Sequence, residues 1–268
     1  MAKNKFSRSN VKSSILKKII IRVNFIGLTD LLGCVNGLKS IMNGKFTKFS
    51  PINNNNYNVN LNSPLNNNLV NVNLEKKTLY QFTDCKIGPS NANFMLGPDF
   101  AYIEINSSDN YEGCNEYIWL MANVIDSIRK FDSFISIQRL GLRKVDIARF
   151  KDDKELSKSV EKSIWETYKN SSACFPLKKV YSDLIFQRNV QTVFNIQRIV
   201  QEIEVDGSKE FQFVFDIDSY KNDNLINSDD LSTVERIEDM ISKQMNEPIF
   251  NYFIDTFTEQ YIDNFYHG

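Results

Sequence analysis

Residues 135–147 read Ile-Ser-Ile-Gln-Arg-Leu-Gly-Leu-Arg-Lys-Val-Asp-Ile, a run that predicts one long β-strand. Side chains of a strand alternate between its two faces with a period of two. One face should therefore carry an apolar stripe interrupted by two arginines and a glycine: Ile135, Ile137, Arg139, Gly141, Arg143, Val145 and Ile147. A buried guanidinium group is costly unless a partner compensates its charge. The sequence thus predicts a carboxylate or a ligand beside each arginine.

A second predicted strand, the aromatic segment 210–218, supplies candidate carboxylates. Asp216 and Asp218 share one face of this strand, opposite Phe215 and Ile217. One interpretation is that the two aspartates pair with the arginines and join two lobes of the protein. Another is that they hold Mg²⁺, which requires a third ligand from elsewhere in the chain.

A different interpretation makes the arginine strand a recognition site for a phosphate or a carboxylate. Arg139 and Arg143 are four residues apart, so their Cα atoms lie ~13 Å from each other along a strand. That separation is too long for both to clamp one phosphate. A bulge at Gly141 would change the geometry by turning one arginine to the other face.

Composition indicates a folded protein. The chain has 268 residues, of which 42% are hydrophobic, and it contains 20 Phe and 11 Tyr. This length is consistent with one large domain or two lobes. Segment 19–21 is apolar, but Arg22 and Asn24 interrupt it and no small-residue cleavage site follows. We therefore expect a cytoplasmic protein with no secretory signal and no membrane association.

Histidine and cysteine usage narrows the chemistry. The one histidine is His267, which argues against Ser-His-Asp and Cys-His mechanisms and against zinc sites built from several imidazoles. The four cysteines form no Cys-x-x-Cys pair, so we expect reduced thiols. No glycine-rich phosphate loop or catalytic serine motif is present. We expect no cofactor and no metal, and the balance leans away from an enzyme.

Positive charge is concentrated at the N-terminus. Residues 1–24 hold seven basic and no acidic residues, whereas the rest of the chain holds 25 basic and 33 acidic ones. A basic arm on an acidic body can bind nucleic acid, or it can act only as a solubilising tail. The candidate nucleic-acid contacts are Lys3, Lys5, Arg8, Lys12, Lys17 and Lys18.

The periodicity of the chain predicts an α+β fold of two similarly ordered lobes, each a mainly antiparallel sheet packed by amphipathic helices. Residues 1–16 are expected to be a disordered basic tail, 17–150 the N-terminal lobe, and 151–268 a C-terminal lobe ending in an aromatic helix. Predicted strands cover 18–28, the Asn-rich segment 57–74 with a turn from Ser63, 78–86, 92–106, 134–149 and 180–218 with a hairpin at Asp206-Gly207. Predicted helices cover 31–43 after an Asp30 cap, 108–130 after a Ser108-Asp109 cap, 153–170, 228–247 until Pro248, and 250–265.

The run Gln138-Arg139-Leu140-Gly141-Leu142-Arg143, followed by Asp146-Ile147, resembles the signature of a sporadically distributed family of uncharacterised prokaryotic proteins. The close of the aromatic strand at Asp216-Ile217-Asp218 and the segment 253–258 are similar to that family too. The resemblance covers about residues 17–262. It implies no defined activity. Its patchy distribution implies an accessory gene of a mobile or defence-type module.

These observations favour a non-catalytic binding or regulatory protein. It would recognise a protein partner, which includes a second copy of itself, or an anionic ligand. One alternative is a nucleic-acid-binding subunit that uses the basic arm. The other is a divalent-metal enzyme that uses Asp216 and Asp218.

Overall fold

The computed structural model describes residues 15–60, 71–88, 91–107, 113–174, 179–188 and 192–267. Within these ranges the strands form one antiparallel sheet of nine strands in the order β2-β3-β4-β5-β1-β6-β9-β8-β7. The strands are β1 (Leu16–Ile26), β2 (Phe46–Asn60), β3 (Asn71–Cys85), β4 (Asn91–Leu96), β5 (Phe100–Asn106), β6 (Ser136–Phe150), β7 (Lys179–Arg188), β8 (Thr192–Val205) and β9 (Ser208–Asn222). The predicted α+β class with antiparallel strands is confirmed.

The two halves of the chain repeat one order of elements but share the sheet. In the first half, β1 is followed by helix α1 (Leu31–Met42), the strands β2 to β5 and helix α2 (Asn115–Phe131). In the second, β6 is followed by helices α3 (Asp153–Ser159) and α4 (Lys162–Cys174), the strands β7 to β9 and helix α5 (Val234–Asp239). β1 and β6 are antiparallel neighbours at the centre, and β6 also pairs with β9. The expected lobe boundary at residue 150 therefore falls at the end of a strand that is hydrogen-bonded to both halves.

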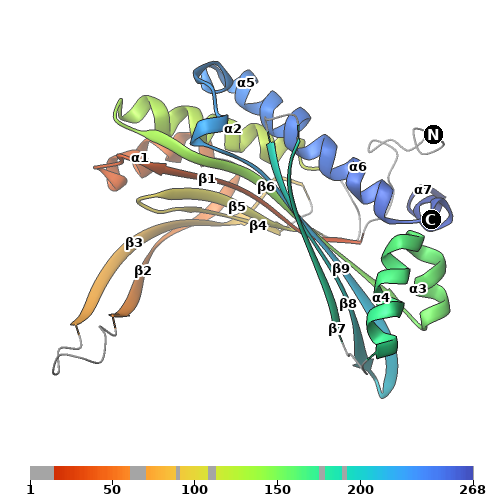
Figure 1. Ribbon diagram of the computed structural model, residues 1–268. Helices are drawn as coiled ribbons and strands as arrows, with labels where there is room; N and C mark the ends of the chain where they lie inside the picture. The colour runs from red at the N-terminus through yellow and green to blue at the C-terminus, as the bar shows by residue number, and fades with distance from the viewer. Residues whose placement is uncertain are drawn as a thin grey trace.

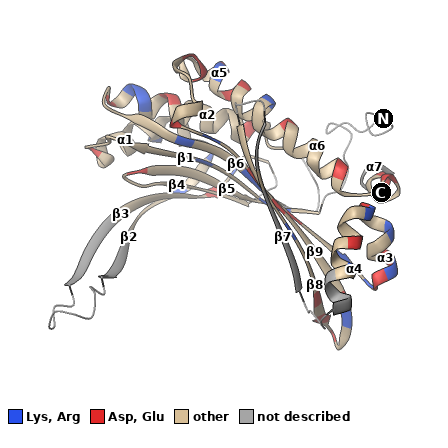
Figure 2. Ribbon diagram, viewed as in Figure 1, with Lys and Arg blue, Asp and Glu red and all other residues tan. Residues whose placement is uncertain are grey.

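The helices lie on one face of the sheet and leave the other without a helical layer in the described part of the chain (Figure 1). Helix α2 contacts β1 and β5, while the π-helix η5 (Met240–Asn246) contacts β6 and β9. Both ends of the sheet curve away from the helices, so its open face is concave (Figure 1). Charged residues of both signs lie along the helices (Figure 2). No described helix has the length and apolar character needed to cross a membrane.

Alternation along the central strands decides which side chains face the helices. The buried side chains of β1 and β5 include Ile19, Ile21, Val23, Phe25, Ala101, Ile103 and Ile105. The residues between them are partly exposed and stand on the open face. Burying a large apolar side chain contributes roughly 1.5–3 kcal/mol, so this alternation fixes the register strongly.

Strand β6 departs from the predicted alternation at Gln138. Asn24 of β1 pairs with Arg139, but the next residue, Phe25, pairs with Ile137, so Gln138 is an extra residue. A bulge of this kind shifts the alternation by one position. Ile137 is only 7% exposed and lies on the buried face of the sheet. The prediction that Ile137 shares a face with Arg139 is therefore wrong.

The helix predicted over 153–170 is in fact two helices, α3 (Asp153–Ser159) and α4 (Lys162–Cys174). Val160 lies between them and forms an antiparallel bridge with Phe257. The backbone of Phe257 is extended, and it likewise separates helix α6 (Glu247–Thr256) from helix α7 (Glu259–His267). A tertiary backbone pairing therefore overrides helical periodicity at both places.

The helix expected to stop at Pro248 continues. Helix α5, the π-helix η5 and helix α6 (Glu247–Thr256) follow one another directly. Pro248 lies in the first turn of α6. A proline is tolerated in the first turn of a helix, and the wider turns of η5 precede it. The predicted interruption is therefore wrong.

Local signals for helix starts and turns have mixed outcomes. Asp30 caps α1 as predicted, because its side chain accepts a hydrogen bond from the Gly33 amide at 2.8 Å. The Asp206-Gly207 hairpin is also confirmed, with φ values of 50° and 77° that suit a tight two-residue turn. Helix α2 begins only at Asn115, and the cap predicted at 108–109 lies outside the described residues, as does the turn predicted at Ser63.

We expect Phe213→Ala to lower the free energy of unfolding by about 3–5 kcal/mol, because it opens a cavity in the core. Phe213 is fully buried, and its ring packs edge-on against Phe257 with centroids 5.6 Å apart. Phe134→Ala is the matched control, since Phe134 is 84% exposed and its loss should change stability by less than ~0.5 kcal/mol. Urea denaturation measures both. Equal effects of the two substitutions would contradict the assignment of the buried face.

Candidate functional site

The arginine motif lies at the centre of the open face. Arg139, Gly141 and Arg143 occupy alternate positions of β6 on this face. The register places Gly141 opposite Arg22 of β1 on one side and opposite Tyr220 of β9 on the other. Pairing is regular on both sides of the glycine, so it is not the site of a bulge.

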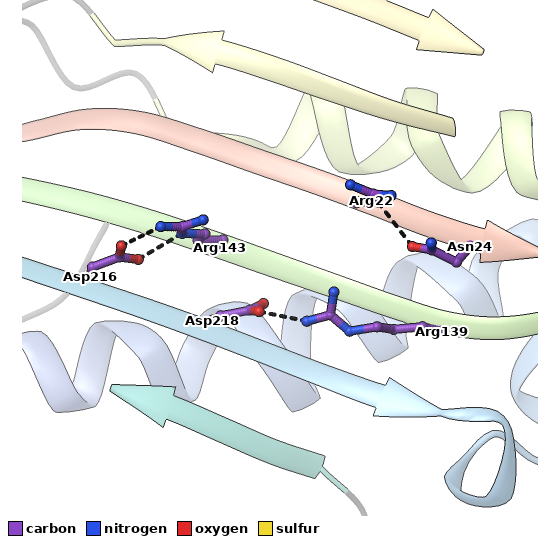
Figure 3. Close-up of polar contacts among 6 residues, drawn as sticks. All are labelled: Arg22, Asn24, Arg139, Arg143, Asp216 and Asp218. Carbon is purple, nitrogen blue, oxygen red and sulfur yellow. Dashed lines mark hydrogen bonds and ion pairs between the residues drawn. The ribbon is translucent and has the colours of Figure 1, made fainter. Parts of the chain in front are cut away.

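Arg143 forms a bidentate ion pair with Asp216 (Figure 3). Its Nε and Nη2 atoms donate to the two carboxylate oxygens at 2.8 and 2.5 Å. The hydrogen bond to Asp216 is the main reason that the pKa of Arg143 is raised above its ordinary value. The side chain of Asp216 is only 12% exposed, whereas that of Arg143 is 47% exposed. The carboxylate is therefore the member of the pair that depends on its partner.

Arg139 forms the second ion pair, with Asp218, and its Nη2 atom donates to Oδ2 at 2.5 Å (Figure 3). In the register Arg139 stands opposite Asn222, so its side chain reaches along β9 to the aspartate. On the way its guanidinium carbon lies 4.2 Å from the ring centroid of Tyr220. Burial raises the pKa of the Asp218 carboxyl, and the charge of Arg139 offsets part of this effect.

Gly141 provides the space that this arrangement needs. A Cβ atom at this position would stand 3.1 Å from the Cβ of Tyr220 and 3.4 Å from Oδ1 of Asp218. Both neighbours belong to the path that links Arg139 to Asp218. The requirement for glycine is therefore close approach of side chains on the open face.

The structure brings together the five residues predicted for this site, but not in the predicted surroundings. Arg139 and Arg143 are partly exposed on the open face, and the buried residues of β6 are their neighbours Leu140 and Leu142. Strands β6 and β9 both belong to the second half of the repeated order of elements, so the two ion pairs join neighbouring strands within that half. They cross only the lobe boundary that the sequence predicted at residue 150. Asp216 and Asp218 accept hydrogen bonds from guanidinium groups, which leaves them poorly suited to a cation. Among the described residues no three His, Cys, Asp or Glu side chains gather as metal ligands.

Sequence reasoning missed the aromatic residues that surround the motif. The guanidinium carbon of Arg22 lies 5.0 Å from the ring centroid of Phe100, which stacks on Tyr102 at 5.8 Å. Tyr102 is the direct neighbour of Arg22 across β1 and β5. The sequence does show that Phe100 and Tyr102 alternate with the apolar residues that are buried. Their position beside the arginine motif depends on strand order, which local patterns do not contain.

Two buried charges on the other face of β6 were also missed. Lys144 and Asp146 are each 5% exposed and point toward the helices. Burial raises the pKa of the Asp146 carboxyl to about 7; Lys144 opposes this shift and Asp216 adds to it. Their spacing could have revealed that they are buried, because Lys144 and Asp146 continue the pattern in which every second residue from Leu140 and Leu142 onward faces the helices.

Most of the predicted basic arm lies outside the described residues, namely Lys3, Lys5, Arg8 and Lys12. Its last two members belong to β1, which starts at Leu16, earlier than predicted. Lys17 is exposed, and Lys18 forms an ion pair with Glu104 at 3.1 Å on the open face. The described part of the arm is therefore an ordered strand.

The described cysteines Cys34, Cys85 and Cys114 carry free thiols. Burial, with a smaller contribution from the charge of Asp30, raises the pKa of Cys34 to about 11. A thiol with a raised pKa is a poor nucleophile at neutral pH.

We expect Arg143→Ala to destabilise the fold by about 2 kcal/mol, because it leaves the nearly buried Asp216 without its bidentate partner. Arg139→Ala should cost about 1 kcal/mol, since the carboxylate that it leaves unpaired, Asp218, is more exposed than Asp216 (26% against 12%) and is held by one hydrogen bond instead of two. Adding Asp216→Asn to Arg143→Ala should restore part of the loss by removing the orphaned charge. Urea denaturation measures all three variants. Arg149→Ala is the control, because this exposed arginine lies on the same strand face. A larger loss for Arg139→Ala than for Arg143→Ala would contradict the burial argument.

The raised pKa of Asp146 predicts a pH-dependent stability. The folded protein holds this proton up to about pH 7, whereas the unfolded chain releases it near 3.8. Stability should therefore fall as the pH rises through that window, by up to about 4 kcal/mol from this group. Asp146→Asn should remove this decline, so the variant gains stability relative to wild type between pH 4.5 and 8.

Urea denaturation at several pH values tests this expectation. Lys144→Met is the companion variant, because removing the cation should raise the pKa of Asp146 further and extend the decline to higher pH. A difference between Asp146→Asn and wild type that is independent of pH would show that the carboxyl has an ordinary pKa.

Comparison with known proteins adds no identification. Neither a scan against protein-family models nor a search of curated proteins gives a match to this chain. The resemblance of the arginine strand to a prokaryotic family stays a prediction, and the function must be argued from the geometry of the open face.

Proposed function

We propose that this chain is a non-catalytic binding protein that recognises a protein partner with the concave open face of its sheet. The observation that carries the proposal is a helical layer on one face of the sheet only (Figure 1), together with an open face that carries arginines (Figure 3) and aromatic residues. An antiparallel sheet can leave one face exposed to water, but that face usually carries polar side chains. Here the partly exposed side chains include Arg22, Phe100, Tyr102, Arg139 and Tyr220.

The composition of this face fits a protein partner. Tyrosine and arginine are enriched among the residues that dominate the energy of protein–protein interfaces. Stacking of Phe100 on Tyr102 and of Arg139 over Tyr220 holds these side chains in place. Binding therefore orders few side chains, which lowers its entropic cost.

Charge argues against nucleic acid as the ligand of this face. Interfaces for nucleic acid are strongly positive, because each phosphate contact needs a cation. On the open face Lys18, Arg139 and Arg143 are each paired with a carboxylate. The metal-enzyme alternative loses its support in the same way, since Asp216 and Asp218 bind guanidinium groups instead.

The cellular setting belongs to the same proposal. A cytoplasmic location and a role as an accessory subunit of a mobile or defence-type module follow from the composition and from the family resemblance. A partner encoded by a neighbouring gene is the natural first candidate, and a second copy of the chain is the other.

Affinity capture from the native host tests the proposal. Wild-type protein should capture a specific partner. The double variant Tyr102→Ala/Tyr220→Ala should capture at least ~10-fold less of that partner, because two aromatic contacts disappear. Trp119→Ala is the matched control, since this 43% exposed aromatic residue lies on helix α2. Capture that is unaffected by the double variant would refute the proposal. Capture that disappears after nuclease treatment would instead identify nucleic acid.

A further inference from the structure

The charges of the open face are not fully paired. On strands β4, β5, β1, β6, β9 and β8, this face carries the cations Lys18, Arg22, Arg139, Arg143 and Arg149 and the acids Glu104, Glu210, Asp216 and Asp218. Glu104, Asp216 and Asp218 each form an ion pair with a different cation. Glu210 lies near the start of β9, far along the strand from Tyr220, which is level with Arg22. Within the described ranges, Arg22 and Arg149 have no carboxylate at ion-pair distance. The surplus cation at the centre of the face is Arg22, whereas Arg149 lies near the end of β6.

Neighbouring side chains hold Arg22 in place without neutralising it. Its Nε atom donates to Oδ1 of Asn24 at 3.0 Å (Figure 3). Its guanidinium carbon lies over the ring of Phe100. Neither neighbour is charged, so the positive charge persists. A guanidinium fixed in this way loses little entropy when it binds a second group.

The partly exposed Arg22 has no side chain facing it from the next strand, β6. Directly opposite Arg22 on β6 is Gly141. Side chains of paired residues stand ~5 Å apart, so any larger residue at position 141 would occupy the space beside Arg22. Gly141 places no side chain over Arg22, and the Tyr220 side chain and Asp218 Oδ1 lie 3.1 and 3.4 Å from the position that a Cβ atom would take there. Tyr102 flanks Arg22 on β5.

We infer that Arg22 binds a carboxylate of an acidic segment in the partner protein, an inference that rests on the proposed function of the open face. A carboxylate and a guanidinium form two parallel hydrogen bonds, which gives direction as well as affinity. The rings of Phe100 and Tyr102 provide apolar surface for the stem of an aspartate or glutamate. One unpaired cation among aromatic rings matches one acidic side chain, and it does not match the regular phosphates of a nucleic acid.

Selection from a displayed library of random 12-residue peptides tests the inference with the full-length protein. We expect the selected peptides to be enriched in Asp or Glu. Their affinity, measured by fluorescence polarisation, should fall at least ~10-fold in Arg22→Ala, since hydrogen bonds between charged groups are the strong ones. Arg22→Lys should lie between, because it keeps the charge and loses the bidentate geometry. Arg149→Ala is the matched control and should leave the affinity unchanged.

Charge reversal gives the sharper result. Arg22→Glu should reject the acidic peptides and bind versions in which lysine replaces the selected acid. The selection could instead yield peptides that lack acidic residues and still need Tyr102 and Tyr220 for binding. That result would overturn the role assigned to Arg22 and leave the proposed function standing. Peptides insensitive to Arg22, Tyr102 and Tyr220 would overturn both. Tighter binding of oligo(dT) than of any selected peptide, lost in Arg22→Ala, would overturn the inference in favour of nucleic acid.

Discussion

The hydrogen-bonded pairing of β6 with β1 on one side and with β9 on the other holds the two halves of the chain in one sheet. Strand β6 satisfies both constraints with different side chains on its two faces. Leu140 and Leu142 pack under the helices, while Arg139 and Arg143 pair with aspartates of β9 on the open face. If β6 slipped by one residue, the leucines would be exposed and the guanidinium groups would face the core. Burial and ion pairing therefore enforce the same register.

Alternation of residue types predicted much of this arrangement. It identified β6 and β9, the shared face of Asp216 and Asp218, and the arginines that needed carboxylate partners. It failed where long-range pairing decides the outcome. The bulge at Gln138 exists because β1 and β6 pair around it, and the break at Val160 exists because Phe257 bridges to it. The neighbours of Arg22 follow from strand order, which a single sequence with no matched family does not reveal.

The charges of β6 divide into two kinds with different physical consequences. On the open face, water screens the arginine–aspartate pairs, so they contribute modest stability and specify which strands meet. Under the helices, Lys144 and Asp146 lie in a poorly solvated region, where the carboxyl holds its proton to higher pH. Strand β6 thus presents arginines to the solvated face, where aspartates of β9 balance two of them, and buries Lys144 and Asp146 on the other face.

The repeated order of elements in the two halves has a consequence for orientation. A concave surface made of two equal halves would accept an extended partner in either direction with the same energy. Here the halves differ in their side chains: the β6–β9 side presents arginine–aspartate pairs, and the β1–β5 side presents Arg22 with the stacked rings of Phe100 and Tyr102. This difference gives the face a polarity, so that under the proposed function an extended partner would bind in one orientation.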